Sequence, residues 1–496
     1  MSDRPGSGAD VIWAAGSPGL GAPADTEWEM VIGLEVHAEL LTRSKLFSGS
    51  PNAFGGEPNT NIDPVCMGLP GTLPVLNRHA VELAIRVGLS LGSLVQPSVF
   101  ARKNYFYPDM PKDYQISQYD RPINVGGSLE LPTGKVIGIV RAHLEEDTGK
   151  TTHMGGAGRI DDAAYSLVDY NRAGVPLLEI VSYPDLRSPA EAREYVTELR
   201  STLLAVGASD GKMEEGSLRV DANVSVRPVG AGEFGTRCEI KNVNSLRSLG
   251  RALEYEARRQ IRMLSVGEPV TQQTRHWNED TGRTSALRTK EEATDYRYFP
   301  EPDLVPLDPD PAWVERIRAE LPLLPRERRH RLAGLIGEDP ARVSLVTERG
   351  QDDLALAAIE AGAAPAAVLK HLEQNLADGS GELTADGLAE LIGMEARGEL
   401  TSNQVKDVLA EMVRTGESPA TVARRAGFEA VAAGELAAVV DRIIAEHPEE
   451  WRRLCAGDGR ERKKMQGFFT GQVMRATKGQ ANGRDVAALL ADRAGS

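Results

Sequence analysis

A histidine lies between two glutamates in the segment "VIGLEVHAEL", residues 31–40. Side chains two apart on a β-strand share a face, so Glu35, His37 and Glu39 would project from such a strand together. Carboxylates with one imidazole are suitable ligands for Mg²⁺ or Mn²⁺ held beside a phosphate. Taken alone, the alternation is more typical of the solvated face of an antiparallel sheet, so other residues must decide between the two interpretations.

Further carboxylates and cations occupy polar faces or ends of other expected strands. Glu145 ends the alternating run "KVIGIVRAHLEED", and Glu179 and Glu214 are two more candidate ligands. Several cationic residues share this part of the chain: Arg141, Arg219, Arg227, Arg237 and Lys241. Acidic and guanidinium groups together are what a phosphoryl-transfer centre needs. The competing interpretation is a solvent-exposed face of the sheet whose charged side chains form ion pairs with one another.

The segment "LEEDTGKT", residues 144–151, ends like a nucleotide-binding P-loop but lacks its first glycine, because Leu144 stands there. Any use of ATP therefore proceeds without such a loop. The chain also has no GxSxG elbow, no Ser-rich amidase signature and no cysteine at position 2. If glutamine supplies nitrogen, we expect another chain to release the ammonia.

Two segments combine aromatic and basic residues. Residues 99–120 hold six of the 25 aromatic residues together with Lys103 and Lys112, which is compatible with core packing or with stacking on a substrate or RNA base. The last 46 residues carry ten Arg or Lys against four Asp or Glu. The candidate nucleic-acid contacts there are Lys463, Lys464, Arg475 and Lys478. A solvated helix face is the alternative for this charge run.

The patterning predicts an α+β region followed by an all-helical one. Residues 28 to about 304 alternate like strands of an antiparallel sheet, with helices interleaved. One of these, at 188–207, opens with Ser188-Pro189. After a Pro-rich linker the pattern is helical, and the segment 401–416 should begin at Thr401 or Ser402 and stop at Gly416.

Composition narrows the class of protein. No run of about 20 apolar residues exists, so we expect no membrane association. Three distant cysteines favour a reducing cytoplasm without disulfides. A net charge of −15 argues against a protein that coats nucleic acid non-specifically, although a local basic patch remains compatible with it.

Many segments of the chain resemble one family collinearly. They include "IGLEVHAELLTRSKLF", "KNYFYPDMPKDYQISQYD", "HLEEDTGK", "DYNRAGVPLLEIV", "SLRVDANVSVR" and "DYRYFPEPDL". All resemble the B subunit of the tRNA-dependent aspartyl/glutamyl-tRNA amidotransferases, the GatB family. The end "GFFTGQVMRATKGQANGRDVAALL" looks like that subunit's YqeY-like tail. The first 27 residues are rich in Gly, Pro, Ala, Ser and Asp, and we expect them to form a disordered tail. With the resemblance we expect a catalytic domain at 28–310, a helical domain at 311–420 and a tRNA-binding YqeY-like domain at 421–496.

The resemblance implies an ATP- and Mg²⁺-dependent ligase that acts on misacylated Glu-tRNA(Gln), Asp-tRNA(Asn) or both. This subunit would phosphorylate the tRNA-bound side-chain carboxylate, and ammonia would then displace the phosphate. A heterotrimer is implied, with an amidase-class A subunit as glutaminase and a small C subunit. The catalytic fold would resemble the antiparallel sheet of glutamine synthetase and the guanidino kinases, which uses ATP without a P-loop.

The resemblance also assigns roles to residues of this chain. The expected catalytic set is Glu35, His37, Glu145, Glu146, Lys103, Lys112 and Arg219. Of these, Lys103, Lys112 and Glu146 resemble charged residues at the end of an ammonia tunnel. The expected metal ligands are Glu35, His37, Glu145, Glu179 and Glu214. The expected ATP-binding residues are Arg141, Asn171, Asp221, Asn223 and Lys241. Glu39 gains nothing from the resemblance and is expected to be a surface carboxylate.

The sequence departs from the family where many members carry four zinc-binding cysteines. The corresponding positions here are Ser48, Ser50, Asp63 and Cys66. With three thiolates missing, we expect no structural zinc and a loop held by packing and by proline turns. Two other classes stay open: a tRNA-binding scaffold with an inert carboxylate face, and a metal-dependent hydrolase that acts without tRNA.

Overall fold

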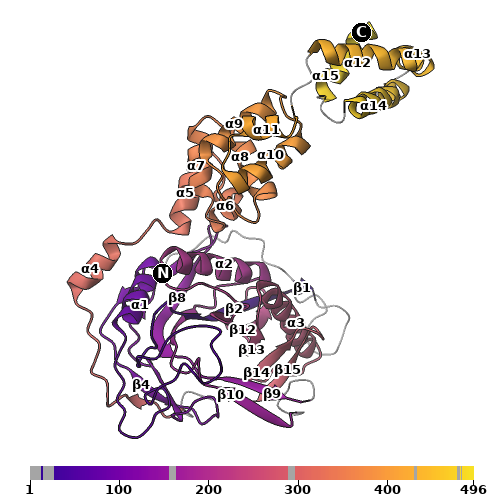
Figure 1. Ribbon diagram of the computed structural model, residues 1–496. Coiled ribbons are helices and arrows are strands. Elements are labelled where there is room, and N and C mark those ends of the chain that lie inside the picture. Colours follow the sequence, from indigo (N-terminus) through magenta and orange to yellow (C-terminus); the bar gives the residue numbers. More distant parts are fainter. Residues whose placement is uncertain are drawn as a thin grey trace. The chain divides into compact units, whose positions relative to one another are not determined.

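The computed structural model describes residues 13–14, 27–155, 163–288, 296–428, 433–457, 459–477, 481 and 483–495 (Figure 1). The chain divides into two compact units, residues 1–327 and 328–496. Most of the expected N-terminal tail, and Lys478 of the expected nucleic-acid set, lie outside the described residues. No described helix is both long enough and apolar enough to cross a membrane.

A large sheet forms the centre of the first unit, and its described part joins fourteen strands. In spatial order, its main path runs through β15 (Arg283–Arg288), β14 (Gln273–Asn278), β13 (Cys238–Val243), β12 (Leu218–Pro228), β2 (Glu27–Glu39), β11 (Pro176–Ser182), β8 (Val136–Glu146), β5 (Tyr114–Ser117), β4 (Ala101–Asn104) and β16 (Phe299–Pro300). Neighbours on this path pair antiparallel except β13 and β14, which are parallel. This confirms the α+β class predicted from the sequence.

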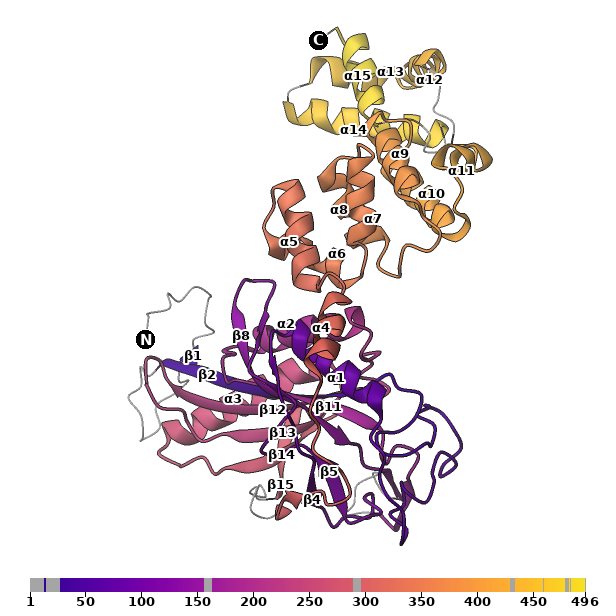
Figure 2. The same ribbon diagram turned by 90° about the vertical axis from the view of Figure 1, so that its left-hand side faces the viewer.

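Short strands complete the first unit. They are β1 (Trp13–Ala14), β3 (Leu94–Val95), β6 (Asn124–Val125) and β7 (Ser128–Glu130), attached to the large sheet, and the separate hairpin of β9 (Lys150–Met154) and β10 (Tyr165–Asp169). The long strand β2 runs beside β12 over eleven paired residues (Figure 2). Its neighbour on the other side is β11.

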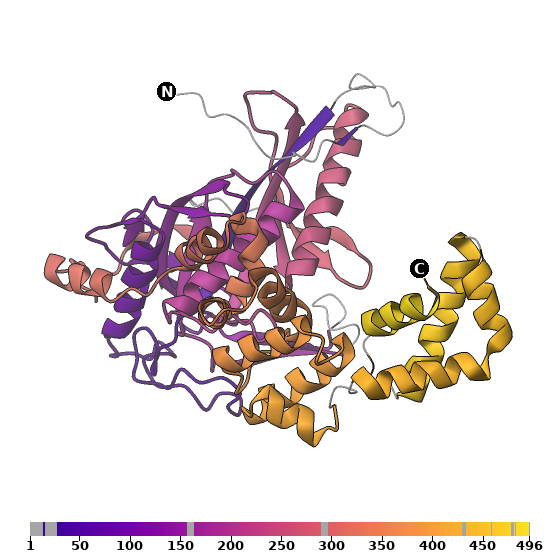
Figure 3. The same ribbon diagram turned by 90° about the horizontal axis from the view of Figure 1, so that it is seen from above.

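One face of the sheet is apolar and the other polar, as the alternation along β2 requires. Ile32, Leu34 and Val36 are fully buried on the apolar face. Helices α1 (Arg78–Ser90), α2 (Pro189–Ala205) and α3 (Leu246–Ser265) contact the sheet, and α3 runs alongside its strands (Figure 3). Helix α2 begins at the predicted Ser188-Pro189 cap. The three helices pack on the apolar face of the sheet and form one core with it. The opposite, polar face carries the candidate ligand side chains of β2, β8 and β11.

Helix α4 (Pro311–Ala319) belongs to the first unit. It packs on α1, where Trp313 and Val314 join the core of the sheet domain. The sequence places residue 311 at the start of the helical domain, whereas the structure divides the chain at 327/328. The sequence of such an amphipathic helix shows which of its residues are apolar. It does not show against which domain this apolar face packs.

The second unit is helical, as expected. Two hydrophobic clusters lie in it, one within α5–α11 and one within α12–α15. Its elements are α5 (Pro325–Ile336, which begins in the first unit), the short 3₁₀ helix Pro340–Val343, α6 (Ser344–Glu348), α7 (Asp352–Glu360), α8 (Pro365–Asn375), α9 (Ala385–Ala396), α10 (Ser402–Thr415), α11 (Pro419–Arg425), α12 (Ala433–Glu446), α13 (Pro448–Ala456), α14 (Gly459–Ala476) and α15 (Gly483–Arg493). Helix α10 has the predicted ends: Thr401 caps it in a capping box, and Gly416 stops it at φ 70°.

Candidate metal and phosphoryl-transfer site

The register of four strands aligns polar side chains across the sheet. Glu179 of β11 pairs with His37 of β2 on one side and with His143 of β8 on the other. Arg219 of β12 pairs with His37 from the far side of β2. Residues directly opposite in an antiparallel pair have Cβ atoms about 4.5–5.5 Å apart, so these four side chains form a continuous row on the polar face.

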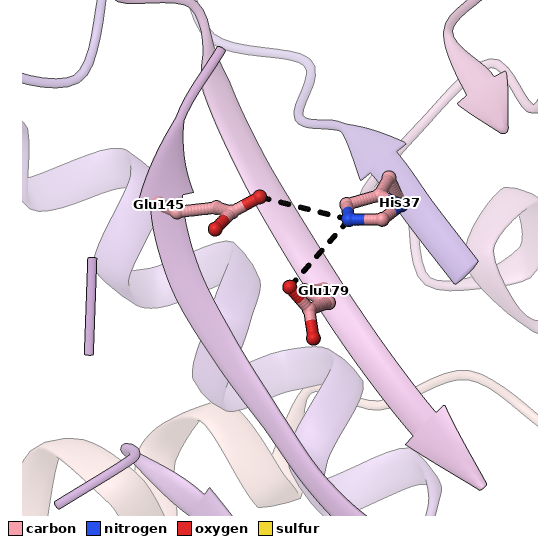
Figure 4. A group of neighbouring side chains, drawn as sticks. All are labelled: His37, Glu145 and Glu179. Atoms are coloured by element: carbon pink, nitrogen blue, oxygen red, sulfur yellow. Dashed lines mark ion pairs between the residues drawn. The ribbon is translucent and has the colours of Figure 1, made fainter. Parts of the chain in front are cut away.

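Three ligand groups converge at the centre of this row (Figure 4). His37 Nε2 lies 3.5 Å from Glu179 Oε2 and 3.7 Å from Glu145 Oε1. One ligand atom from each residue lies within 4.8 Å of the others, and this is the one such group of three among the described residues. We call His37, Glu145 and Glu179 the triad. An ion bound at about 2.1 Å sets neighbouring donors about 3 Å apart and opposite donors about 4.2 Å apart, so the triad fits a Mg²⁺-sized cation.

Burial makes the charges of the triad depend on one another. Burial disfavours the His37 cation, but the hydrogen bond and charge of Glu179 and the charge of Glu145 outweigh it and raise the pKa of His37 to about 9. Burial disfavours ionised Glu179 as well, yet His143 and His37 hold its pKa below the usual value. Burial and the charge of Glu179 raise the pKa of Glu145. The protonated His37 thus supplies a positive charge between the two carboxylates, as a bound cation would.

His143 is a site residue that the sequence assignment missed. Its Nε2 lies 3.7 Å from Glu179 Oε2 and 3.9 Å from Glu145 Oε2, and its side chain is buried. Burial, with the charges of Arg141 and His37 and despite Glu179, lowers the pKa of His143 to about 4. The signal was present in the sequence, because His143 alternates with Glu145 on the same strand face.

A second group of charges lies beside the triad and holds Arg219. Arg219 Nη1 is 2.8 Å from Asp147 Oδ2, and Arg172 Nε is 3.3 Å from the same oxygen. Burial and the neighbouring Asp147 raise the pKa of Glu39 to about 7, against the charges of Arg219 and Arg172. The expectation that Glu39 is a surface carboxylate is therefore wrong. It is half-buried, because β11 and β12 flank β2 on both sides.

Glu35 lies on the same strand face as His37 but has different neighbours. Asn223 Nδ2 donates a 2.9 Å hydrogen bond to Glu35 Oε1. Next to this pair, Lys241 Nζ contacts Asp221 Oδ2 at 2.6 Å. Glu35 thus stands beside the triad rather than within it. Three of the expected ATP-binding residues surround it.

Other residues assigned from the sequence lie in different surroundings. Arg141 Nη2 is 3.9 Å from Glu179 Oε1, at the edge of the triad. The amide of Asn171 is used by the loop at 57–61, since it donates to the Glu57 carbonyl at 2.6 Å and accepts from Asn61. Glu214 lies exposed in a turn before β12. The structure therefore places Arg141 at the site, and it brings neither Asn171 nor Glu214 into the triad.

The expected tunnel residues lie on the β5 and β4 side of the triad. Lys112 forms a buried ion pair with Glu146, which also accepts a 2.9 Å hydrogen bond from the Ile116 amide. Together with Lys45 they line a cavity of about 30 Å³. Lys103 Nζ lies 4.8 Å above the ring of Tyr296. All three expected residues are present around the site, each with an aromatic or acidic partner.

Tyr298 is a second residue that the assignment missed. It stacks on Tyr119 with ring centroids 4.1 Å apart, and burial together with the charges of Glu145 and Glu179 raises its pKa. Tyr298 immediately precedes β16, which joins the sheet at β4, far away in the sequence. No local pattern could have connected it to the triad.

The positions that correspond to the family's zinc ligands bond to one another. Ser48 Oγ lies 3.1 Å from Cys66 Sγ, and the Cys66 amide donates to Asp63 Oδ1 at 2.8 Å. Burial opposes ionisation of Asp63, but hydrogen bonds from Cys66 and Ser48 outweigh it and lower the pKa of Asp63. Hydrogen bonds, in addition to the expected packing and proline turns, therefore hold this loop.

Three of the four candidate nucleic-acid residues of the tail lie on α14. Lys463, Lys464 and Arg475 are exposed. The neighbouring Phe469 is buried, and its ring packs edge-on against Trp451 at 5.4 Å. Phe469 thus packs in a core with Phe468 against it, whereas Lys463, Lys464 and Arg475 face solvent.

Comparison with known families and proteins covers most of the chain. A model of the GatB/GatE catalytic domain matches residues 30–315, and a model of the GatB domain matches residues 363–493. The triad and Arg219 lie within the first of these regions, and α14 lies within the second.

Curated relatives are similar along nearly their whole length. A protein of Moorella thermoacetica is 48% identical over 487 residues, covering 94% of this chain and all of the relative. A protein of Thermosynechococcus vestitus is 46% identical, covering 95% and 97%, and one of Salinispora arenicola is 48% identical, covering 95% and 97%. Each of the three is named as the B subunit of an aspartyl/glutamyl-tRNA(Asn/Gln) amidotransferase. The chain belongs to this GatB family of amidotransferase B subunits.

Proposed function

We propose that this chain is the B subunit of a tRNA-dependent amidotransferase and that its polar sheet face activates the substrate with ATP. The substrate is the side-chain carboxylate of glutamate or aspartate esterified to a tRNA. A carboxylate oxygen attacks the γ-phosphorus of ATP, which gives an acyl phosphate and ADP. Ammonia then attacks the acyl carbon, phosphate leaves, and the nitrogen loses a proton to give the amide.

The triad is the observation that carries this proposal. His37, Glu145 and Glu179 would hold Mg²⁺, which neutralises charge on the transferring phosphoryl group when bound. Glu35, on the same strand face as His37, is a further candidate carboxylate ligand. Glu214 is left out of the proposed ligand set because it lies in an exposed turn.

Cationic side chains next to the triad would orient the phosphates. Asp147, which also pairs with Arg172, holds the Arg219 guanidinium beside His37, and Arg141 lies at the other edge near Glu179. Positioned guanidinium groups stabilise the charge of a phosphoryl-transfer transition state without reorganising. Lys241, held by Asp221, would contact the nucleotide on the Glu35 side.

The cavity at Lys112 and Glu146 would deliver ammonia to the acyl phosphate. Its volume of about 30 Å³ suits one or two water-sized molecules. The buried ion pair offers both donors and acceptors to a small polar molecule. Ammonia would be released from glutamine by an amidase-class A subunit, and a small C subunit would complete the heterotrimer.

The proposal extends to the architecture. The antiparallel sheet would resemble the catalytic sheet of glutamine synthetase and the guanidino kinases. Such a sheet binds ATP without a P-loop. We propose a helical domain and a YqeY-like tail after it, with Lys463, Lys464 and Arg475 contacting tRNA phosphates. The site of action would be the cytoplasm, where tRNA is aminoacylated.

An assay with both misacylated tRNAs tests the proposal. The chain is co-expressed with candidate A and C subunits and supplied with ATP-Mg²⁺, glutamine and either Glu-tRNA(Gln) or Asp-tRNA(Asn). We expect amidated aminoacyl-tRNA and one ADP for each amide formed. Equal activity after Glu145→Gln would support the inert scaffold instead, and phosphate release without tRNA would support the hydrolase.

A further inference from the structure

Two tyrosines from distant segments stack on each other beyond β8. The rings of Tyr119 and Tyr298 are nearly parallel, with centroids 4.1 Å apart and 9° between their planes. Tyr119 follows the end of β5 by two residues, and Tyr298 immediately precedes β16. We call these two residues the tyrosine pair. The proposed chemistry gives them no role so far.

The registers of the strands place the tyrosine pair next to the triad. Ser117 of β5 lies opposite Glu145 and donates a 3.3 Å hydrogen bond to Glu145 Oε2. Continuing this register by two residues brings Tyr119 to His143, on the polar face of β8. Neighbouring strands lie about 4.8 Å apart, so the two steps from β11 to β5 span about 10 Å.

Electrostatic interactions agree with this placement. Burial and then the charges of Glu145 and Glu179 raise the pKa of Tyr298, so its hydroxyl lies within reach of the triad carboxylates. On the other side of the pair, Phe299 of β16 lies opposite Arg102 of β4. The same register, continued by one residue, sets Tyr298 opposite Lys103. The pair therefore stands between the triad and β4.

One ring of the tyrosine pair is covered and the other is open. Tyr298 is half-buried between Tyr119 and the edge of Tyr296, whose ring centroid is 6.1 Å away. Asn104 Nδ2 holds this segment by donating 2.9 Å hydrogen bonds to the carbonyls of Tyr296 and Arg297. Tyr119 is 43% exposed, and in the described part of the chain its ring contacts no aromatic ring other than Tyr298. One face of Tyr119 is thus positioned and available for stacking.

Exposed cations flank the tyrosine pair in the sequence. Arg297 precedes Tyr298, and Arg121 follows Tyr119 by two residues. Both arginines are exposed, and Arg121 forms no ion pair with any residue that the structure describes. Asp120 is the acidic residue of this segment. An aromatic ring bordered by cations is the arrangement that binds single-stranded nucleic acid, because bases stack on the ring and phosphates pair with the cations.

We propose that the tyrosine pair binds the terminal adenosine of the misacylated tRNA, with the base stacked on Tyr119 and the esterified amino acid extending to the triad. The inference rests on the proposed function. Ribose, ester and amino-acid side chain separate the base from the reacting carboxylate, and the distance of about 10 Å across two strand spacings suits this linkage. The adenosine of ATP has the same chemistry, but the proposed function places that nucleotide at Lys241, on the opposite side of the triad.

Binding of shortened tRNA to the full-length chain tests this site. Each of tRNA(Gln) and tRNA(Asn) is prepared with its complete CCA end and without the terminal adenosine. We expect the wild type to bind the complete form of its tRNA about tenfold more tightly, since stacking of a base on an aromatic side chain has about this effect. Tyr119→Ala should bind both forms alike. Tyr119→Leu, which keeps an apolar cover on Tyr298, should do the same, and Tyr119→Phe should keep the preference.

The control is Tyr165→Ala, which removes another exposed tyrosine (59% exposed) on the separate hairpin and should leave the preference unchanged. The Kd of Mg-ATP should be the same in all variants, and thermal unfolding confirms that each one folds. A wild-type preference in Tyr119→Ala and Tyr119→Leu, or no preference in the wild type, would overturn the site. Weaker ATP binding with an unchanged tRNA preference would overturn it as well and assign the pair to the nucleotide.

Failure of this site and failure of the proposed function give different results. If the tRNA preference ignores Tyr119 while tRNA-dependent ADP formation still requires the triad, the site is wrong and the function stands. If the preference depends on Tyr119 but no acyl phosphate forms on any misacylated tRNA, the site stands and the function is wrong.

Discussion

The two compact units use charge in opposite ways. In the first unit several charged side chains are buried or half-buried in partnered groups, such as the triad and the Asp147–Arg219 pair. In the second unit most lie at the surface, as Lys463 and Lys464 do on α14. A buried charge interacts strongly and locally because few waters screen it, whereas an exposed charge acts weakly but over a distance set by salt. This difference predicts that the first unit carries out phosphoryl transfer and that the second contacts the phosphates of a nucleic acid.

The largest effect is expected at the triad. Glu145→Gln keeps the shape of the side chain but removes a ligand charge, and we expect amidation to fall at least about 10³-fold. The measurement is the initial rate of amidated tRNA formation at saturating ATP, glutamine and tRNA. Glu214→Gln is the matched control and should retain the wild-type rate. Similar losses in both variants would break the distinction between the triad and a surface carboxylate.

A stability effect is expected at a buried carboxylate away from the site. Glu256 of α3 is fully buried and lies 2.6 Å from Arg259 and 3.1 Å from Arg275. Glu256→Gln leaves two guanidinium groups without a counter-charge and should lower the free energy of unfolding by about 3 kcal/mol. Denaturant unfolding of the full chain measures it. A change below about 0.5 kcal/mol would show that burial does not set the strength of these pairs.

The same carboxylate gives a pH dependence. Burial opposes its ionisation, but the hydrogen bonds and charge of Arg259 outweigh burial and lower the pKa of Glu256. A depressed folded-state pKa stabilises the fold above the unfolded value of about 4.3 and loses that stabilisation as pH falls through the folded value. We therefore expect the wild type to lose more stability than Glu256→Gln between pH 5 and pH 3. Parallel pH profiles would contradict this assignment.

A moderate, salt-dependent effect is expected on α14. Replacing Lys463, Lys464 and Arg475 by alanine should weaken tRNA binding about tenfold near 0.1 M salt. The slope of log affinity against log salt should fall by up to about three units, because each lost phosphate contact releases one fewer counterion. The rate at saturating tRNA should not change. An unchanged slope would show that these cations face solvent and do not contact tRNA phosphates.

The smallest effect is expected at a partly exposed pair of the second unit. Glu395 lies 2.9 Å from His371 Nε2 and 3.4 Å from Lys370 Nζ. Glu395→Gln should change the free energy of unfolding by less than about 1 kcal/mol, because Glu395 is partly exposed and solvent screens its charge, and because the glutamine amide can still accept a hydrogen bond from His371. A loss as large as that of Glu256→Gln would remove the contrast between the units.

Local structure was predictable where one short segment determines it. Thr401, Gln404 and Gly416 fix both ends of α10 by themselves, and period-two alternation identified the polar face of β2. Strand order was not predictable in this way. Strand β2 lies between β11 and β12, which follow it by about 140 and 190 residues. Their registers, which set Glu179 and Arg219 beside His37, depend on the packing of the whole sheet.

The surroundings of individual side chains were not predictable for the same reason. Glu39 resembled a solvated carboxylate because its neighbour Arg219 comes from β12 and its neighbour Asp147 directly follows β8. Asn171 carries a side chain suited to a nucleotide, but a loop more than 100 residues earlier uses its amide. The family resemblance compensated for part of this, since collinear motifs carry information about tertiary neighbours that alternation lacks.

The most direct test of the central role of the triad is tRNA-dependent ADP formation in the assembled complex without glutamine. With the wild type, ATP, misacylated tRNA and Mg²⁺, we predict a burst of ADP that needs both the tRNA and the ion. With Glu179→Gln, whose carboxylate pairs with His37 across the β2–β11 register, we predict no burst. A burst of wild-type size from the Glu179→Gln complex would contradict the assignment of the triad as the metal centre for carboxylate activation.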